Sequence, residues 1–146
     1  MKKLSLLLLG IALLGACKKN SDATPSRTDL LTTPTWKLST GIVTVNGFPV
    51  PASTLLNACY ADDTYKFNVD KTAVNDAGAI KCNATDPQTQ TGSWSFSNSD
   101  QTQLQLTVPN NILLNGTFDI KELTSTTLRL SGTLSGYPVD ATFTPN

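Results

Sequence analysis

The chain has 146 residues, with eleven basic and eleven acidic side chains and no histidine. This length suits a single domain with a small core. The lack of a basic patch argues against a nucleic-acid partner. The lack of histidine removes the commonest general base and the commonest transition-metal ligand.

The chain begins with Lys2 and Lys3, followed by an apolar run from Leu4 to Leu14. Such a run is too short to cross a bilayer as a helix, which needs about 20 apolar residues. A positive start before a short apolar run is typical of a secretory leader. The sequence therefore predicts a signal peptide over residues 1–16, and not a helix of the folded domain.

The segment Leu14-Gly15-Ala16-Cys17 directly follows this run and resembles the lipobox of bacterial lipoproteins. The resemblance implies cleavage before Cys17 and acylation of its thiol, so that the membrane is a partner through this anchor. We expect the cell envelope as the location. In Bacteroidetes-type lipoproteins, an acidic cluster after the cysteine marks surface export. Lys18-Lys19-Asn20 does not match that cluster, which favours the outer membrane facing the periplasm.

The next segment, residues 17–33, is polar and rich in Ser, Thr and Asn, which predicts a lipidated tether rather than part of the core. A short helical turn over "SRTDLL" (residues 26–31) can dock on the domain where the tether ends. The folded domain is predicted over residues 34–146.

From Trp36 onward, apolar residues recur at every second position, the pattern of strands with one buried and one wet face. Turn residues such as Asn46-Gly47 and Ser135-Gly136 separate the runs. One short helix is expected over "PASTLLNA" (residues 51–58). Eight strands are predicted, over residues 36–45, 64–69, 73–82, 93–97, 103–108, 116–122, 127–134 and 139–144.

Eight strands joined by short links favour an all-β, up-and-down antiparallel barrel, because closure removes the exposed edges of a meander. The alternative is an immunoglobulin-like sandwich, in which a tryptophan lies between two widely spaced cysteines. Cys59 and Cys82 are close in sequence, and neither tryptophan falls between them. The barrel is therefore the favoured fold.

Several segments in this order resemble the lipocalin-like domains of Bacteroidetes lipoproteins: "TPTWKL", "CYADDTYKFNVDKTAV", "IKC", "TGSWSF" and "IKELTSTTLRLSG". The resemblance covers about residues 30–146 and implies a small lipocalin-like barrel with one disulfide. True lipocalins carry Gly-x-Trp on the first strand, where this chain has Pro34-Thr35-Trp36. Here the motif comes later, as Gly92-Ser93-Trp94. The resemblance implies no common activity.

Two cysteines remain once Cys17 is assigned to the anchor. Because the expected compartment is oxidising, we expect a structural disulfide between Cys59 and Cys82. The following Asp62-Asp63 pair is open to two readings, a calcium site or a turn that caps the next strand. Calcium needs six to eight oxygen ligands, and no calcium-binding loop motif is present, so no metal or other cofactor is expected.

The sequence also lacks a catalytic set. Serine has no histidine to activate it, and no nucleophile-elbow motif is present. Glu122 and Asp119 could in principle form a carboxylate pair, but both are expected on an exposed strand end. We therefore expect a protein that is not an enzyme.

Fifteen large apolar residues are expected to point into the barrel and to leave little free volume. Any pocket should be apolar, near one mouth, and walled by Trp36, Tyr65 and Trp94. The leading functional hypothesis is an envelope lipoprotein that binds a small apolar ligand. The alternative is a structural or partner-binding, inhibitor-like accessory lipoprotein with a filled barrel. The expected inward set is Trp36, Leu38, Tyr65, Phe67, Val69, Ile80, Trp94, Phe96, Leu104, Leu106, Phe118, Ile120, Leu128, Leu130 and Phe143.

Overall fold

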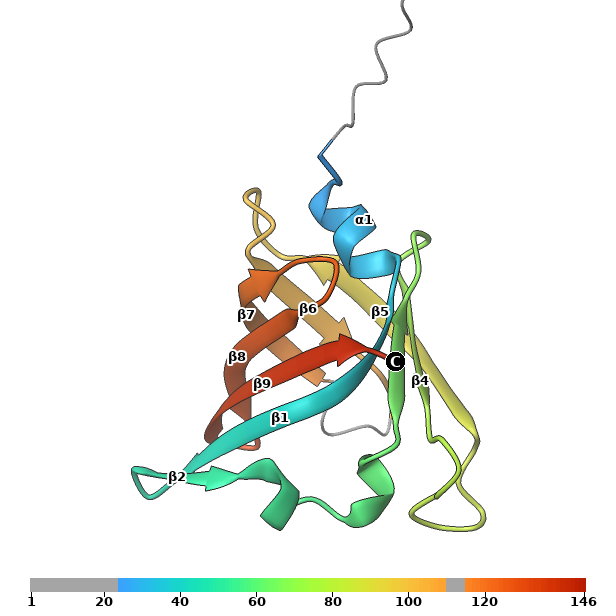
Figure 1. The fold of residues 1–146 in the computed structure, drawn as a ribbon, viewed down its shortest axis with the longest axis vertical. Coiled ribbons are helices and arrows are strands. Elements are labelled where there is room, and N and C mark those ends of the chain that lie inside the picture. The colour runs from blue at the N-terminus through green and yellow to red at the C-terminus, as the bar shows by residue number, and fades with distance from the viewer. Residues whose placement is uncertain (1–23, 110–114) are drawn as a thin grey trace, which may run out of the picture.

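The computed structural model describes residues 24–109 and 115–146, and these fold into one antiparallel sheet that closes on itself (Figure 1). In the described residues, one α-helix, α1 (Arg27–Thr32), precedes the sheet. Two short 3₁₀ turns, η1 (Ala52–Thr54) and η2 (Ala58–Tyr60), lie in the connection between its second and third strands. The strands are β1 (Thr35–Val45), β2 (Phe48–Pro51), β3 (Thr64–Phe67), β4 (Thr72–Asp76), β5 (Thr89–Phe96), β6 (Gln103–Thr107), β7 (Asn115–Leu123), β8 (Leu128–Leu134) and β9 (Tyr137–Pro145).

The sheet is an eight-stranded, up-and-down barrel formed by β1 and β3 to β9. Each of these strands pairs antiparallel with its neighbour, and β9 returns to β1 to close the ring, with Trp36 opposite Pro145 and Val43 opposite Val139. Strand β2 only extends the far end of β1 as a hairpin through Asn46 and its neighbouring glycine. The barrel expected from the sequence is confirmed, and all eight expected strands have a counterpart in it.

The barrel is filled by one hydrophobic cluster from its inward faces. Trp36 and Leu104 are fully buried, and most of the expected inward residues belong to this cluster or pack against it. Two of those expectations are wrong: the side chains of Val69 and Ile80 are 71% and 58% exposed. Strands β3 and β4 end at Phe67 and Asp76, so both residues lie in connections beyond the paired backbone.

Helix α1 covers one end of the barrel (Figure 1). Ser26 begins it with a capping box, in which Asp29 and Ser26 each accept a hydrogen bond from the other's backbone N–H. Leu31 is fully buried in the barrel core, and its carbonyl accepts a hydrogen bond from the Trp36 indole at 2.9 Å. Residues 27–32, expected as the end of the tether, therefore pack onto the domain.

The C-terminal end of α1 is held by a lysine from β3. The ammonium of Lys66 donates to the carbonyls of Thr32, Thr33 and Pro34 at 2.6, 2.9 and 3.2 Å. These carbonyls have no partner within the helix, and a cation suits this end of the helix dipole.

The other end of the barrel is bordered by η1, η2 and the long β4–β5 loop (Figure 1). The short helix expected over residues 51–58 is here only the single turn η1, because the chain ends β2 at Pro51 and must cross the barrel mouth to reach β3. We call this end, opposite α1, the open end.

Candidate functional site

An apolar cavity of about 100 Å³ lies inside the barrel at the open end. Tyr65, Leu130 and Phe143 contribute to its wall, and η1 covers it through Ala52. The ring of Tyr65 packs edge-on against Phe143, with centroids 5.6 Å apart. Ligand pockets commonly enclose about 300–1,000 Å³, so this cavity suits a small apolar group or the end of a longer one.

A surface groove of about 600 Å³ lies on the other side of the same cover. The cavity and the groove share Leu38, Gly41, Ile42, Ala52 and Leu56 as lining residues. The turn η1 packs closely on β1. A Cβ added at Gly41 in β1 would lie only 2.9 Å from the Ala52 methyl in η1. The cavity and the groove therefore lie next to each other along β1 and η1.

Of the three residues expected to wall a pocket, Trp36 and Tyr65 lie directly opposite each other in the β1–β3 pairing. Tyr65 lines the apolar cavity, whereas Trp36 and Trp94 are packed in the core and line neither this cavity nor the groove. The Trp36 indole is bonded under α1, and the Trp94 indole donates to the Asn68 carbonyl at 2.9 Å. Both tryptophans therefore belong to the end of the barrel that α1 covers.

Trp94 is also occupied on its ring face. The ammonium of Lys71 lies 3.8 Å from the centre of the indole, within the range of a cation–π contact. Phe67 and Phe96 pack against the indole edge-on. The Trp94 ring is thus in contact with side chains of this chain, and its role in the structure is packing.

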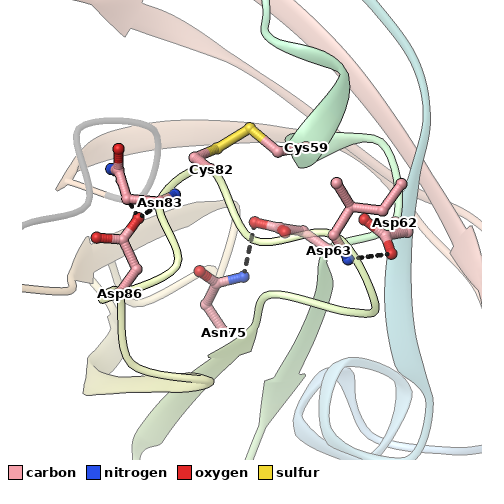
Figure 2. The surroundings of a disulfide bond; sticks show 8 residues. Cys59, Asp62, Asp63, Asn75, Cys82, Asn83 and Asp86 are labelled. Carbon is pink, nitrogen blue, oxygen red and sulfur yellow. Dashed lines mark hydrogen bonds between the residues drawn. A yellow bond between two sulfur atoms is a disulfide. The ribbon is translucent and has the colours of Figure 1, made fainter.

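The disulfide expected from the sequence is present. Cys59 in η2 is bonded to Cys82 in the β4–β5 loop, with their Cα atoms 5.2 Å apart (Figure 2). The neighbouring Asp62 accepts hydrogen bonds from the backbone N–H groups of Ala79 and Ile80 in that loop, at 2.6 and 3.2 Å. Asp62 thus fastens the loop to η2, instead of capping the strand that follows it.

Sequence reasoning missed a second, polar cavity of about 580 Å³ beside this disulfide. Asp63, Asn75 and Gln90 line it from the segment before β3, from β4 and from β5. Figure 2 shows Asp63 and Asn75 facing each other near the disulfide, with a hydrogen bond of 3.1 Å between them. Burial is the main cause that raises the pKa of the Asp63 carboxyl.

The described residues offer little for hydrolysis or metal binding. Asp119 is half exposed and paired with Lys121 at 3.1 Å, and hydrogen bonds from Gln103 and Lys121 lower its pKa. A general acid needs a raised pKa. Across residues 24–109 and 115–146, no group of three or more Cys, Asp or Glu side chains is placed to hold a metal ion.

The acylation expected at Cys17 lies outside the described residues. Within the described part of the chain, no helix has the length and apolar character needed to cross a membrane.

Comparison with known proteins gives a family and a fold. The lipocalin-like domain family matches residues 32–130. A lipocalin-like protein from Bacteroides uniformis is similar in structure, with a TM-score of 0.50 and 13% identity over 80% of this chain and 99% of that one. An uncharacterized protein from Bacteroides eggerthii has a TM-score of 0.48 and 12% identity over 77% and 98% of the two chains. No curated protein matches. With two thirds of its length matched, and a closed eight-stranded barrel, the chain belongs to the family of lipocalin-like domains.

Proposed function

We propose that this protein is a non-enzymatic lipoprotein of the bacterial cell envelope whose barrel binds a small apolar group at the open end. The observation that carries the binding proposal is the apolar cavity beneath η1, which adjoins the hydrophobic cluster of the barrel. Burying apolar surface releases about 25 cal/mol per Å², so even a short alkyl chain would gain useful affinity there.

The proposed ligand has a narrow apolar end and a larger remainder. The cavity has room only for the end, while the groove beyond η1 is about six times larger in volume and shares five lining residues with the cavity. A ligand that inserts its end into the barrel could rest the remainder in the groove after a small displacement of the Ala52–Thr54 turn.

The test is native mass spectrometry of the purified protein with added n-decanol, compared with a variant whose cavity is filled. Ala141 lines the cavity, so Ala141→Leu should remove decanol binding. Ala84→Leu, on the exposed part of the β4–β5 loop, is the matched control and should bind as the wild type does. Equal binding by the Ala141→Leu variant and the wild type would contradict the proposal.

The anchor is a separate part of the proposal and has its own test. Cells given an alkyne analogue of palmitate should label the wild-type protein, and Cys17→Ala should lose both the label and its sedimentation with the outer membrane. Surface protease treatment of intact cells should leave the wild-type protein intact if the domain faces the periplasm, as Lys18 and Lys19 after the cysteine suggest.

The alternative, a protein-binding accessory lipoprotein with a filled barrel, is favoured by one observation. Phe48 at the tip of the β1–β2 hairpin is 73% exposed, which is unusual for a large aromatic side chain. If Phe48→Ser abolishes the recovery of an envelope protein by cross-linking in cells, while decanol does not bind, the alternative holds.

A further inference from the structure

The polar cavity beside the disulfide has a wall rich in acceptors. Asp63 and Asp86 both line it, and among the described residues no lysine or arginine does. The one lysine of the loop, Lys81, is turned to its own backbone, where its ammonium donates to the carbonyls of Ala84 and Asp86 at 2.9 and 2.8 Å. Among the described residues, the charged side chains that line the cavity are therefore carboxylates.

Asp63 is the most deeply placed of these acceptors. Its side chain is only 4% exposed, and in the described part of the chain its carboxylate has one hydrogen-bond donor, the amide of Asn75. Nearby Asp62 and Asp76 add repulsion to the effect of burial, and both effects raise its pKa. A buried carboxylate is costly unless a cation or several donors compensate it.

A second acceptor lies one strand further along the barrel. The side-chain oxygen of Gln90 is buried and has no hydrogen-bond partner among the described residues. Gln90 lies directly opposite Asn75 in the β4–β5 pairing, and Asn75 lies opposite Tyr65 in β3. Asp63 and Gln90 thus flank Asn75, and among the described residues Asp63 has one side-chain donor, whereas the Gln90 oxygen has none of the donors that buried oxygens normally find.

We propose that this cavity binds an organic cation through a primary ammonium group. The ammonium donates to the Asp63 carboxylate, whose charge it neutralises, and to the Gln90 side-chain oxygen, which has no other donor among the described residues. A hard metal ion fits less well, because among the described residues no group of three or more Cys, Asp or Glu side chains is placed to hold one.

The site does not depend on the apolar cavity. The two cavities have no lining residue in common, and the polar one is large enough, at about 580 Å³, to take a small diamine entirely. Binding of a cation here and binding of an apolar group beneath η1 can therefore succeed or fail separately.

The test is calorimetric titration of the full-length protein in detergent micelles with 1,4-diaminobutane, with the neutral isostere 1,4-butanediol as the comparison ligand. Neither ligand is apolar enough to bind beneath η1. We expect the diamine to bind the wild type at least about tenfold more tightly than the diol, the ratio typical of a charge-assisted hydrogen bond.

Asp63→Asn keeps an oxygen for the Asn75 amide but removes the charge, so it should reduce this ratio to near one. Asp100→Asn is the matched control, because Asp100 is an exposed carboxylate in the β5–β6 turn at the opposite end of the barrel, and it should leave the ratio unchanged. Equal affinities of the diamine and the diol in the wild type, or an unchanged ratio in Asp63→Asn, would overturn the proposal.

A second measurement needs no variant. In a nitrogen-15 spectrum of the wild type, the diamine should shift the side-chain amide resonances of Asn75 and Gln90 and leave the Trp36 indole resonance in place. Shifts confined to surface residues away from the polar cavity would overturn the assignment of the site.

Discussion

The docking of α1 can be tested by truncating one buried side chain, with Leu31→Ala. Leu31 is 0% exposed and packs in the same cluster as Trp36. Truncation of a buried leucine to alanine costs about 3 kcal/mol, through lost burial and the space left behind. That is a large part of the roughly 5–15 kcal/mol that stabilises a domain.

The assay is urea unfolding of residues 18–146 followed by tryptophan fluorescence. With a denaturant slope of about 1.5 kcal/mol per molar urea, a loss of about 3 kcal/mol moves the midpoint down by about 2 M. Leu30→Ala is the matched control on the same helix, because Leu30 is only partly buried and should lower the midpoint about half as much. Equal midpoints for the two variants would refute the reasoning that α1 belongs to the core.

Two further predictions concern the disulfide and two closely packed glycines. Reducing the Cys59–Cys82 bond, which joins cysteines 23 positions apart, should lower the free energy of unfolding by about 3.5 kcal/mol on the chain-entropy model, and calorimetry with and without reductant measures this. Gly92→Ala should cost about 3 kcal/mol or more, because the new Cβ would overlap the Thr107 carbonyl and lie 2.6 Å from the Val108 Cα, both rigid backbone of the next strand. Gly41→Ala should cost less, because its new Cβ would be close to the Ala52 methyl in η1 but at an ordinary 3.9 Å from the Asp140 carbonyl oxygen. The same thermal unfolding midpoint for both glycine variants would contradict this explanation.

The barrel could be predicted from the sequence because alternation of apolar residues directly reports which side of a strand is buried. The same rule explains the two wrong inward positions. In the sequence, the alternation continues through Val69 and Ile80, both of which are exposed. The strands themselves end at Phe67 and Asp76. After Phe67 the chain turns at Lys71, which has a left-handed φ of 72°, and after Asp76 the loop turns toward Cys82. Local backbone geometry, which alternation does not encode, set those ends.

The position of a residue along the barrel axis could not be predicted in the same way. Trp36, Tyr65 and Trp94 all point inward, as expected, but which of them share a level depends on the stagger between strands. Trp36 lies directly opposite Tyr65, yet of the three residues Tyr65 alone lines the apolar cavity at the open end. The capping box of Ser26 and Asp29 was a readable signal for α1, yet the burial of Leu31 depends on how the helix meets the finished barrel.

The polar cavity did leave a signal in the sequence, which lay in the exceptions to the pattern. In β4, Asn75 lies on the same face of the strand as the buried Ala73. In β5, Gln90 lies on the same face as the buried Trp94. Both polar residues therefore occupy inward positions. An inward polar residue is costly in a core, and two on neighbouring strands indicate a place where the interior is wet or bound to a ligand. Their convergence on Asp63 required the register of three strands, which only the structure provides.

The raised pKa of Asp63 gives a last prediction that bears on why this carboxylate is kept. Because burial raises its pKa, the folded state holds the proton at pH values where the unfolded state has lost it. Asp63 therefore destabilises the fold more and more as the pH rises from the carboxyl's pKa in the unfolded chain to its higher pKa in the folded protein. Above the folded-state pKa, the full free-energy cost of burying the charge is reached. Asp63→Asn should then be more stable than the wild type at neutral pH, and this gain should shrink in acid as the wild-type carboxyl becomes protonated.

Taking the difference between the two proteins cancels the acid-labile carboxylates they share, such as Asp29 and Asp70, whose pKa values are lowered by hydrogen bonds from Ser26 and Thr72. Thermal midpoints of both proteins between about pH 3 and pH 8 measure that difference. A wild type more stable than Asp63→Asn at neutral pH would mean that the chain itself compensates the charge, and the case for a bound cation would fail. A gain in stability on removing the charge would instead show that Asp63 costs the unliganded fold free energy, as expected for a residue retained for binding.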